Sequence, residues 1–236
     1  MGMELEQMHD WIVDEFARRR PIADSMGALI AQCEAAQPHP DWAKLRALPY
    51  ADLLPLIDWI QKPFREEPSP VLLRGLWFGL FNPCPDGRTP VSDIYVCGSE
   101  RFEPDHDDNS WAVSPDWWPE ARYASSSVLA EIYRIAYRQG ARVGEQKGCL
   151  GNDAEYPLCL GYGAFAMREV LTVVKASQIL GESDSLGIAV GFDSGDFILL
   201  GELTRDGLVA IDANSFPLAR SASEGGHSNG CDRGSW

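Results

Sequence analysis

Three strand-like runs in the last quarter of the chain constrain its fold more than any other feature. The stretch Gly187 to Asp212 contains GIAVGFD, FILLGEL and GLVAID. Between the first two runs, Ser194-Gly195 fits a tight hairpin turn. Between the last two, Thr204-Arg205-Asp206-Gly207 fits a longer turn that ends in glycine. The sequence therefore predicts a three-stranded antiparallel meander over residues 187–212.

A second pair of strands is predicted in the first half of the chain. Val71 to Phe81 is rich in large apolar residues, as a buried strand would be. After a turn that contains three prolines, Val91 to Gly98 alternates, with Ile94 and Val96 on one face. We expect these two strands to pair as an antiparallel hairpin.

The remaining periodic segments have the three- and four-residue spacing of amphipathic helices. We predict helices over residues 3–20, Asp24–Ala36, Trp42–Leu48, Pro49–Gln61, Ser125–Gln139 and Asp153–Ala176. In the last of these, Gly161 and Gly163 lower helix propensity, so another element is expected to pack closely there. Residues 62–70 contain three prolines and mark the change from helix to sheet.

These elements predict an α+β fold with a mainly antiparallel sheet, a helical N-terminal part and additional packed helices. A single domain is expected over residues 1–214, with its helical part in residues 1–65 and its sheet-containing part in residues 70–214. Residues 215–236 are small, polar and glycine-rich, and a disordered tail is expected there.

Composition narrows the classes of function. The chain has 236 residues and a net charge of −15, without a basic stripe, which disfavours nucleic acid as a direct ligand. Its apolar runs are too short to cross a bilayer, so no membrane partner is expected. The N-terminus carries acids first and Arg18–Arg20 last, the reverse of a signal peptide, which favours a cytoplasmic location.

The segment from Ser99 to Glu120 is the part of the sequence that folding explains least. It contains seven acids against one base and has no sustained periodicity. We predict a partner-binding surface in this segment, because tryptophan is enriched at binding hot spots and carboxylates select a basic partner. The predicted contact residues are Asp105, Asp107, Asp108, Trp111, Trp117 and Trp118. The alternative is burial of the tryptophans over the sheet, and of the adjacent Trp117 and Trp118 one is expected at the surface.

No catalytic, cofactor or metal motif is recognisable. Asp105, Asp107 and Asn109 alternate as in a calcium loop, but Ser110 replaces its turn glycine and Asp116 its bidentate glutamate. The cysteines form no CxxC pair, and no histidine belongs to an HExxH or HxH arrangement. No cofactor is therefore expected. The alternative to binding is an enzyme with a dispersed active site, such as a metal-assisted hydrolase using His106 and the nearby aspartates.

Several packing features recur together in residues 71–135, about a quarter to a third of the chain. They are the aromatic-rich strand Leu76–Phe81, the short strand Ile94–Ser99, the acids Asp105–Asp108 before Trp111-Ala112, and the helical run Val128–Tyr133. In this order the segment resembles bacterial immunity proteins of polymorphic toxin systems. The resemblance implies a cytoplasmic, non-catalytic protein that binds and neutralises a cognate toxin, often a nuclease with a basic active-site surface.

Overall fold

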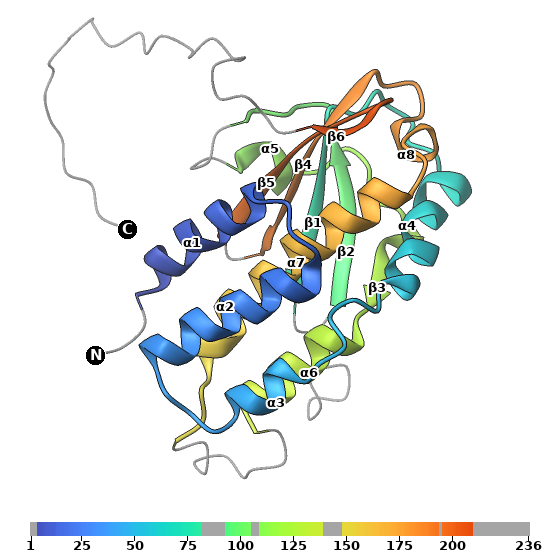
Figure 1. Cartoon of the computed structure of the whole chain (residues 1–236). Helices are drawn as coiled ribbons and strands as arrows, with labels where there is room; N and C mark the ends of the chain where they lie inside the picture. The colour runs from blue at the N-terminus through green and yellow to red at the C-terminus, as the bar shows by residue number, and fades with distance from the viewer. Residues whose placement is uncertain (1–3, 82–92, 105–108, 139–147, 194, 210–236) are drawn as a thin grey trace, which may run out of the picture.

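The protein has an α+β fold, as predicted. The computed structural model describes residues 4–81, 93–104, 109–138, 148–193 and 195–209. In this part of the chain a six-stranded sheet has the order β3-β2-β1-β4-β5-β6 (Figure 1). The strands are β1 (Gly75–Phe81), β2 (Asp93–Ser99), β3 (Tyr123–Ser125), β4 (Ser185–Phe192), β5 (Phe197–Thr204) and β6 (Gly207–Val209).

Both predicted antiparallel units are present, and one parallel pairing joins them. β1 and β2 form the expected hairpin, and β4, β5 and β6 form the expected meander as far as Val209. The sheet becomes continuous because β1 pairs in parallel with β4, with Phe78 opposite Val190. This contact joins segments that are far apart in the sequence.

The six helices predicted from the sequence lie close to their predicted positions, apart from the limits of one. The described helices are α1 (Leu5–Ala17), α2 (Ile22–Ala36), α3 (Trp42–Arg46), α4 (Leu54–Glu66), α5 (Ser110–Val113), α6 (Ser127–Ala136), α7 (Asn152–Val173) and α8 (Ser177–Leu180), with a short 3-10 turn η1 at Glu120–Arg122. The short elements α5, α8 and η1 were not predicted. The predicted helix over residues 49–61 is wrong in its limits. It begins later, where Pro55 suits a first turn, and it continues through Pro63 into the expected connection. Pro63 is buried there and Phe64 packs on Trp117, so tertiary contacts offset the cost of a proline inside a helix.

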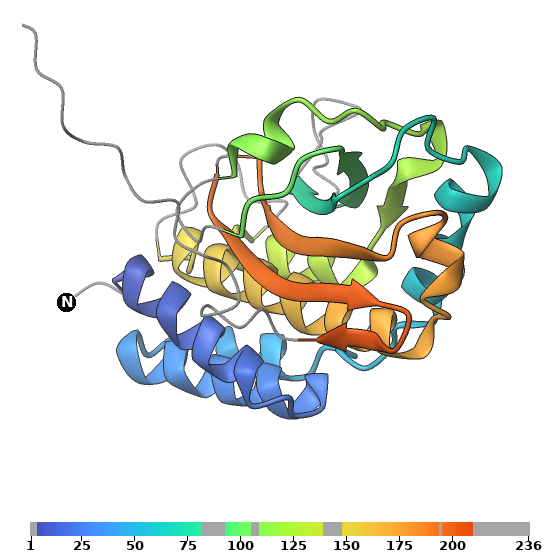
Figure 2. The same ribbon diagram turned by 90° about the horizontal axis from the view of Figure 1, so that it is seen from above.

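Helix α7 is the centre of the molecule. It lies between the sheet and the layer formed by α1 and α2 (Figure 2), and it is buried almost all the way round. The close packing predicted at its glycines is confirmed. A Cβ at Gly161 would lie 2.5 Å from Leu29 of α2, and one at Gly163 would lie 2.9 Å from Val190 of β4. The small residues therefore let α7 approach both neighbours.

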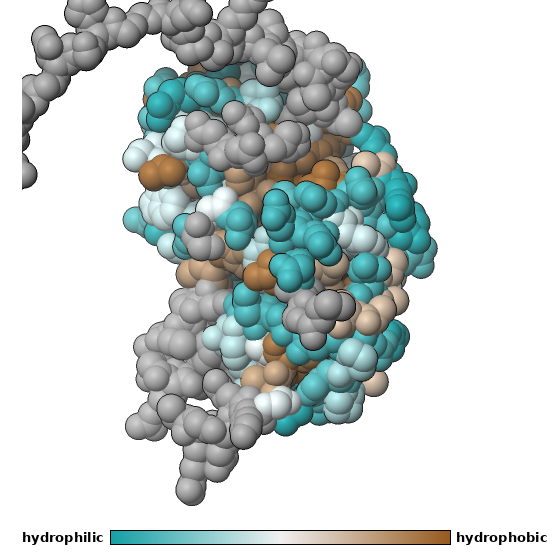
Figure 3. Space-filling view, turned by 90° about the vertical axis from the view of Figure 1, so that its left-hand side faces the viewer, coloured by the Kyte–Doolittle hydropathy of each residue, from teal (hydrophilic) through white to brown (hydrophobic). Residues whose placement is uncertain are grey.

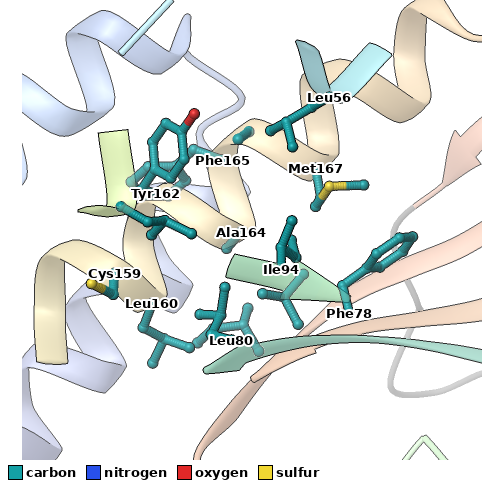
Figure 4. Close-up of a cluster of buried hydrophobic side chains, with 14 of the residues drawn as sticks. Leu56, Phe78, Leu80, Ile94, Cys159, Leu160, Tyr162, Ala164, Phe165 and Met167 are labelled. Carbon is teal, nitrogen blue, oxygen red and sulfur yellow. The ribbon is translucent and has the colours of Figure 1, made fainter. Parts of the chain in front are cut away.

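One large core fills the space between the sheet and the helices. It includes residues of α1, α2 and α4 together with α7 and the strands, so the helical N-terminal part and the sheet share one hydrophobic interior. Figure 4 shows part of it, with Phe78, Leu80 and Ile94 of the sheet near Leu160, Ala164 and Met167 of α7. Cys97 and Cys159 are both buried.

The described surface is mainly polar. Figure 3 shows the side on the left of Figure 1, where hydrophilic residues are interrupted by small hydrophobic areas. Within the described ranges, no helix combines the length and the apolar character needed to cross a membrane. The expected tail at residues 215–236 lies outside the described residues.

Candidate functional site

The face of the sheet opposite α7 carries a smaller core, which is built on glycines. Trp77, Cys97 and Trp111 pack there with residues of β4 and β5. The backbone of β1 is bare at Gly75, where a Cβ would lie 2.7 Å from the Trp111 ring. In β4 a Cβ at Gly187 would lie 2.2 Å from Phe102. Glycines on adjacent strands thus make room for aromatic rings on this face.

Trp111 is therefore a core residue, and its prediction as a partner contact is wrong. Its side chain is fully buried, edge-on to Trp77 at 6.3 Å and to Phe102 at 5.1 Å between ring centroids. The short helix α5 positions it, and burying a ring of this size favours the folded state by the area it removes from water. A partner cannot reach it in this structure.

Trp117 is buried too, so its assignment to a binding surface is also corrected. Its indole N–H donates to the Glu67 carbonyl at 2.8 Å, and its ring packs on Phe64 at 4.7 Å. Its backbone forms an isolated antiparallel bridge with Gly98, where a Cβ would press on Leu73. This bridge anchors the segment after α5 to the end of β2.

Trp118 is the exposed member of the pair, as one of the two was expected to be. It is 46% exposed and lies in an aromatic surface, a term used here for Phe81, Tyr95, Trp118 and Tyr123. Tyr95 is central to it, at 5.2 Å from Trp118 and 6.2 Å from Tyr123 between ring centroids. Tyr123 is 44% exposed. The surface therefore presents two large rings to solvent on a base of two others.

Arg122 holds the two exposed rings in place. Its guanidinium carbon lies 4.6 Å from the Trp118 ring centroid and 4.4 Å from that of Tyr123, and the group donates to the Pro119 carbonyl at 2.7 Å. Cation–π contacts of this kind restrict both rings. The rings are thus ordered before any partner arrives, which lowers the entropy cost of binding.

Tyr95 joins the aromatic surface to the neighbouring β4–β5 turn. Its ring lies across Gly79, where a Cβ would be 2.1 Å away, and its hydroxyl donates to Asp193 at 2.7 Å. Burial and this carboxylate raise the pKa of Tyr95, so the phenol stays protonated and remains a donor. A cavity of about 270 Å³ opens beside it, between Trp118, Val113 and Asp193. Its described lining is mainly apolar and aromatic, and Asp193 is its one acid.

The acids of the predicted segment have different positions. Asp116 is structural, because its carboxylate accepts hydrogen bonds from the Ser99 hydroxyl and the Glu100 amide. Asp105, Asp107 and Asp108, predicted as partner contacts, lie outside the described residues, as does His106. Among the residues that are described, no group of three His, Cys, Asp or Glu side chains could hold a metal ion.

Asp93 lies in another cavity, and it is the one described acid whose pKa is raised by burial. The cavity has a volume of about 340 Å³ and is also lined by Asp52 and Ser125, and Oδ1 of Asp93 has no hydrogen-bond partner among described atoms. Burial raises the pKa of Asp93, against a hydrogen bond from Ser125 that lowers it. The described residues that line this cavity include neither a histidine nor a cysteine.

This environment predicts that Asp93→Asn stabilises the protein at neutral pH. The folded-state pKa of Asp93 is raised, so its contribution to stability is fully present below the ordinary value of 3.8 and is lost as the pH rises. Asparagine cannot ionise and avoids that loss. The midpoint of urea unfolding should rise at pH 7, and the gain should shrink as the pH falls toward 3.8. Asp52→Asn, an exposed change in the same cavity, should have little effect. A lower midpoint for Asp93→Asn at pH 7 would contradict the argument.

Sequence reasoning found Trp118 but missed Tyr95, Arg122, Tyr123 and Asp193. Alternation along β2 indicates which face Tyr95 occupies, but it does not indicate what lies beside it. The pairing of Tyr95 with Tyr123 and the approach of Asp193 depend on contacts between distant segments. No local pattern carries that information.

Comparison of the chain with models of protein families, with curated protein sequences and with solved structures gives no match.

Proposed function

We propose that this protein binds a basic protein partner through the aromatic surface, without catalysis, and that the partner is a toxin domain which it neutralises in the cytoplasm. The observation that carries the proposal is the pair of exposed rings, Trp118 and Tyr123, held rigid by Arg122. Rigid, partly exposed aromatic groups provide contact area at low entropy cost and are typical of binding hot spots.

Charge supports a basic partner in preference to a neutral one. The chain carries −15 overall, and the segment Ser99–Glu120, which supplies Trp118, has seven acids against one base. Such a field speeds the encounter with a positively charged protein and repels nucleic acid. The resemblance to immunity proteins of polymorphic toxin systems supports a toxin as this partner.

The proposal is tested by co-expressing the chain with the toxin-like product encoded beside its gene and measuring growth and direct binding. The full chain should restore growth and bind the product. Trp118→Ala should weaken binding by about 2 kcal/mol, or about thirtyfold in Kd, because it removes a hot-spot ring. Val173→Ala, which shortens another exposed apolar side chain far from the aromatic surface, is the control and should bind normally.

Two results would refute parts of the proposal. Absence of protection by the full chain, with both proteins present, would exclude toxin neutralisation for that product. Equal binding by Trp118→Ala and the unchanged chain would place the interface away from the aromatic surface. The association rate should also fall as salt is raised, because the attraction between the two charged surfaces is screened.

A further inference from the structure

A third cavity lies on the helical side of the sheet, away from the aromatic surface. Its volume is about 470 Å³, which is within the range of small-molecule sites. Its apolar lining comes from Phe16 of α1, Val173 of α7, Leu200 of β5 and Leu208 of β6. The rest of the wall carries three arginines, Arg19, Arg20 and Arg168, against one acid, Glu169, with Pro21 and Thr172 between them.

Arg168 is the buried cation of this wall. It is 7% exposed, and its guanidinium donates to the Phe16 carbonyl at 3.0 Å and to the Arg20 carbonyl. Burial lowers the pKa of Arg168, although arginine remains charged at any ordinary pH. Within the described part of the chain, no carboxylate lies within ion-pair distance of it. Glu169 and Glu15 favour its charged form through space and Arg19 disfavours it, but no carboxylate occupies its donors directly, which leaves them open to an anion.

The nearby acids are already engaged by other groups. Glu15, fully buried, accepts hydrogen bonds from Arg20 at 2.7 Å and from Ser25 at 2.9 Å, and it also pairs with Arg18. Glu169 accepts from the Ile22 amide at 2.5 Å at the start of α2. These contacts use the two carboxylates to hold the α1–α2 turn, so among the described residues neither forms a direct ion pair with Arg168.

Arg168 also has donors to spare. Its guanidinium has five N–H groups, and the two carbonyl contacts fix its plane while leaving others for a ligand. Its carbon lies 5.3 Å from the Phe16 ring centroid and 5.7 Å from that of Phe165, so two aromatic rings also restrict the group. A preformed fork of this kind suits the two oxygens of a carboxylate.

Arg19 adds a second cation at the mouth of the cavity. It is exposed, lines the cavity and has a backbone φ of +52°, in the left-handed region that favours glycine. Arginine is strained in this left-handed backbone conformation, whereas glycine would not be. The side chain therefore contributes something other than stability of the turn.

We infer that this cavity binds a small organic carboxylate, with its carboxyl group against Arg168 and Arg19 and an apolar chain along Phe16, Leu200 and Leu208. This site shares no residue with the aromatic surface, so the inference does not depend on whether a protein binds there. The apolar lining disfavours an inorganic anion, which has no apolar chain to bury. The two arginines repel a cation, even one that carries an apolar chain.

The experiment titrates the full-length protein with octanoate, hexylammonium and inorganic phosphate, measured by calorimetry and by amide chemical shifts in NMR. Octanoate should bind saturably, with shifts at Thr172 and Leu208. Phosphate should bind at least about tenfold more weakly, since it gains nothing from the apolar lining. Hexylammonium should not bind. Absence of saturable octanoate binding, or equal affinity for phosphate, would overturn the inference.

Substitutions of single arginines test whether octanoate binds in this cavity. Arg19→Gly should weaken octanoate binding about two- to fivefold, as loss of an exposed ion pair does, without lowering the melting temperature, because glycine suits the left-handed position. Arg18→Gln removes the same charge one residue away but outside the cavity, and it should leave the affinity unchanged. Equal weakening by both variants would show only a diffuse charge effect and would refute the site.

Arg168→Met should reduce affinity by about tenfold or more, because it removes the charge-assisted hydrogen bonds. The variant also loses the contacts to the Phe16 and Arg20 carbonyls, so its folding must be checked by circular dichroism. If it does not fold, the comparison of Arg19→Gly with Arg18→Gln decides the question. A folded Arg168→Met protein with undiminished octanoate affinity would exclude Arg168 from binding.

Discussion

Replacing Trp117 by alanine is expected to lower the free energy of unfolding by about 3–5 kcal/mol, as large-to-small changes of buried aromatic residues do. The ring is almost fully buried against Phe64, and its N–H would no longer satisfy the Glu67 carbonyl. The cavity left behind lies beside the bridge to Gly98, so the segment that carries Trp118 should loosen as well. Urea unfolding followed by circular dichroism measures the change.

Trp118→Ala is the matched control, because it makes the same chemical change at the next residue. Trp118 is 46% exposed and makes its contacts through Tyr95 and Arg122. We expect a loss of about 1 kcal/mol or less, the range for a partly exposed aromatic pair. Similar losses for the two variants would contradict the division between a core tryptophan and a surface tryptophan.

Gly191→Ala is expected to be the most damaging of the small substitutions, with a loss of at least about 1–3 kcal/mol. An added Cβ would lie 2.4 Å from the Cβ of Phe197, 2.6 Å from the Trp77 ring and 2.7 Å from the Asp196 carbonyl oxygen. One of these contacts is with backbone, so rotation of a side chain cannot relieve all of them. The β4–β5 turn and the smaller core would have to shift together.

Gly27→Ala is the control for that prediction. Gly27 lies within α2, and an alanine Cβ there would meet nothing within 4 Å. Because alanine favours helix over glycine, this variant should gain about 0.5–1 kcal/mol. The two glycine substitutions should therefore have opposite signs in the same unfolding assay. A neutral Gly191→Ala would show that the smaller core tolerates a wider spacing from β4.

The glycines of β1 and β4 explain why this face of the sheet can carry the aromatic surface. The parallel register places Gly75 opposite Gly187 and Gly79 opposite Gly191. Aromatic rings therefore lie directly on the backbone in the centre of the sheet. Tyr95, lying on Gly79, is the base for Trp118 and Tyr123.

The sequence by itself determined the elements whose contacts are local. Alternating apolar residues and short turns predicted the β1–β2 hairpin and the β4–β5–β6 meander, since such pairings need only neighbouring residues. Helical spacing predicted α2, α6 and α7 within a few residues. The limits of α4 were predicted wrongly because a proline can either begin a helix or end it. Pro55 lies in its first turn, whereas Pro63 lies inside the helix, where tertiary packing tolerates it.

Only the tertiary structure decided which of the two adjacent tryptophans faces solvent. Adjacent side chains tend to point in different directions, so the sequence led us to expect one of the two rings at the surface without indicating which. The bridge between Gly98 and Trp117 sets that choice, because it turns the Trp117 ring toward Phe64 and leaves Trp118 beside Tyr95. Likewise, the parallel pairing of β1 with β4 brings Asp193 to Tyr95. Both depend on contacts between distant segments, whose energies no local pattern encodes.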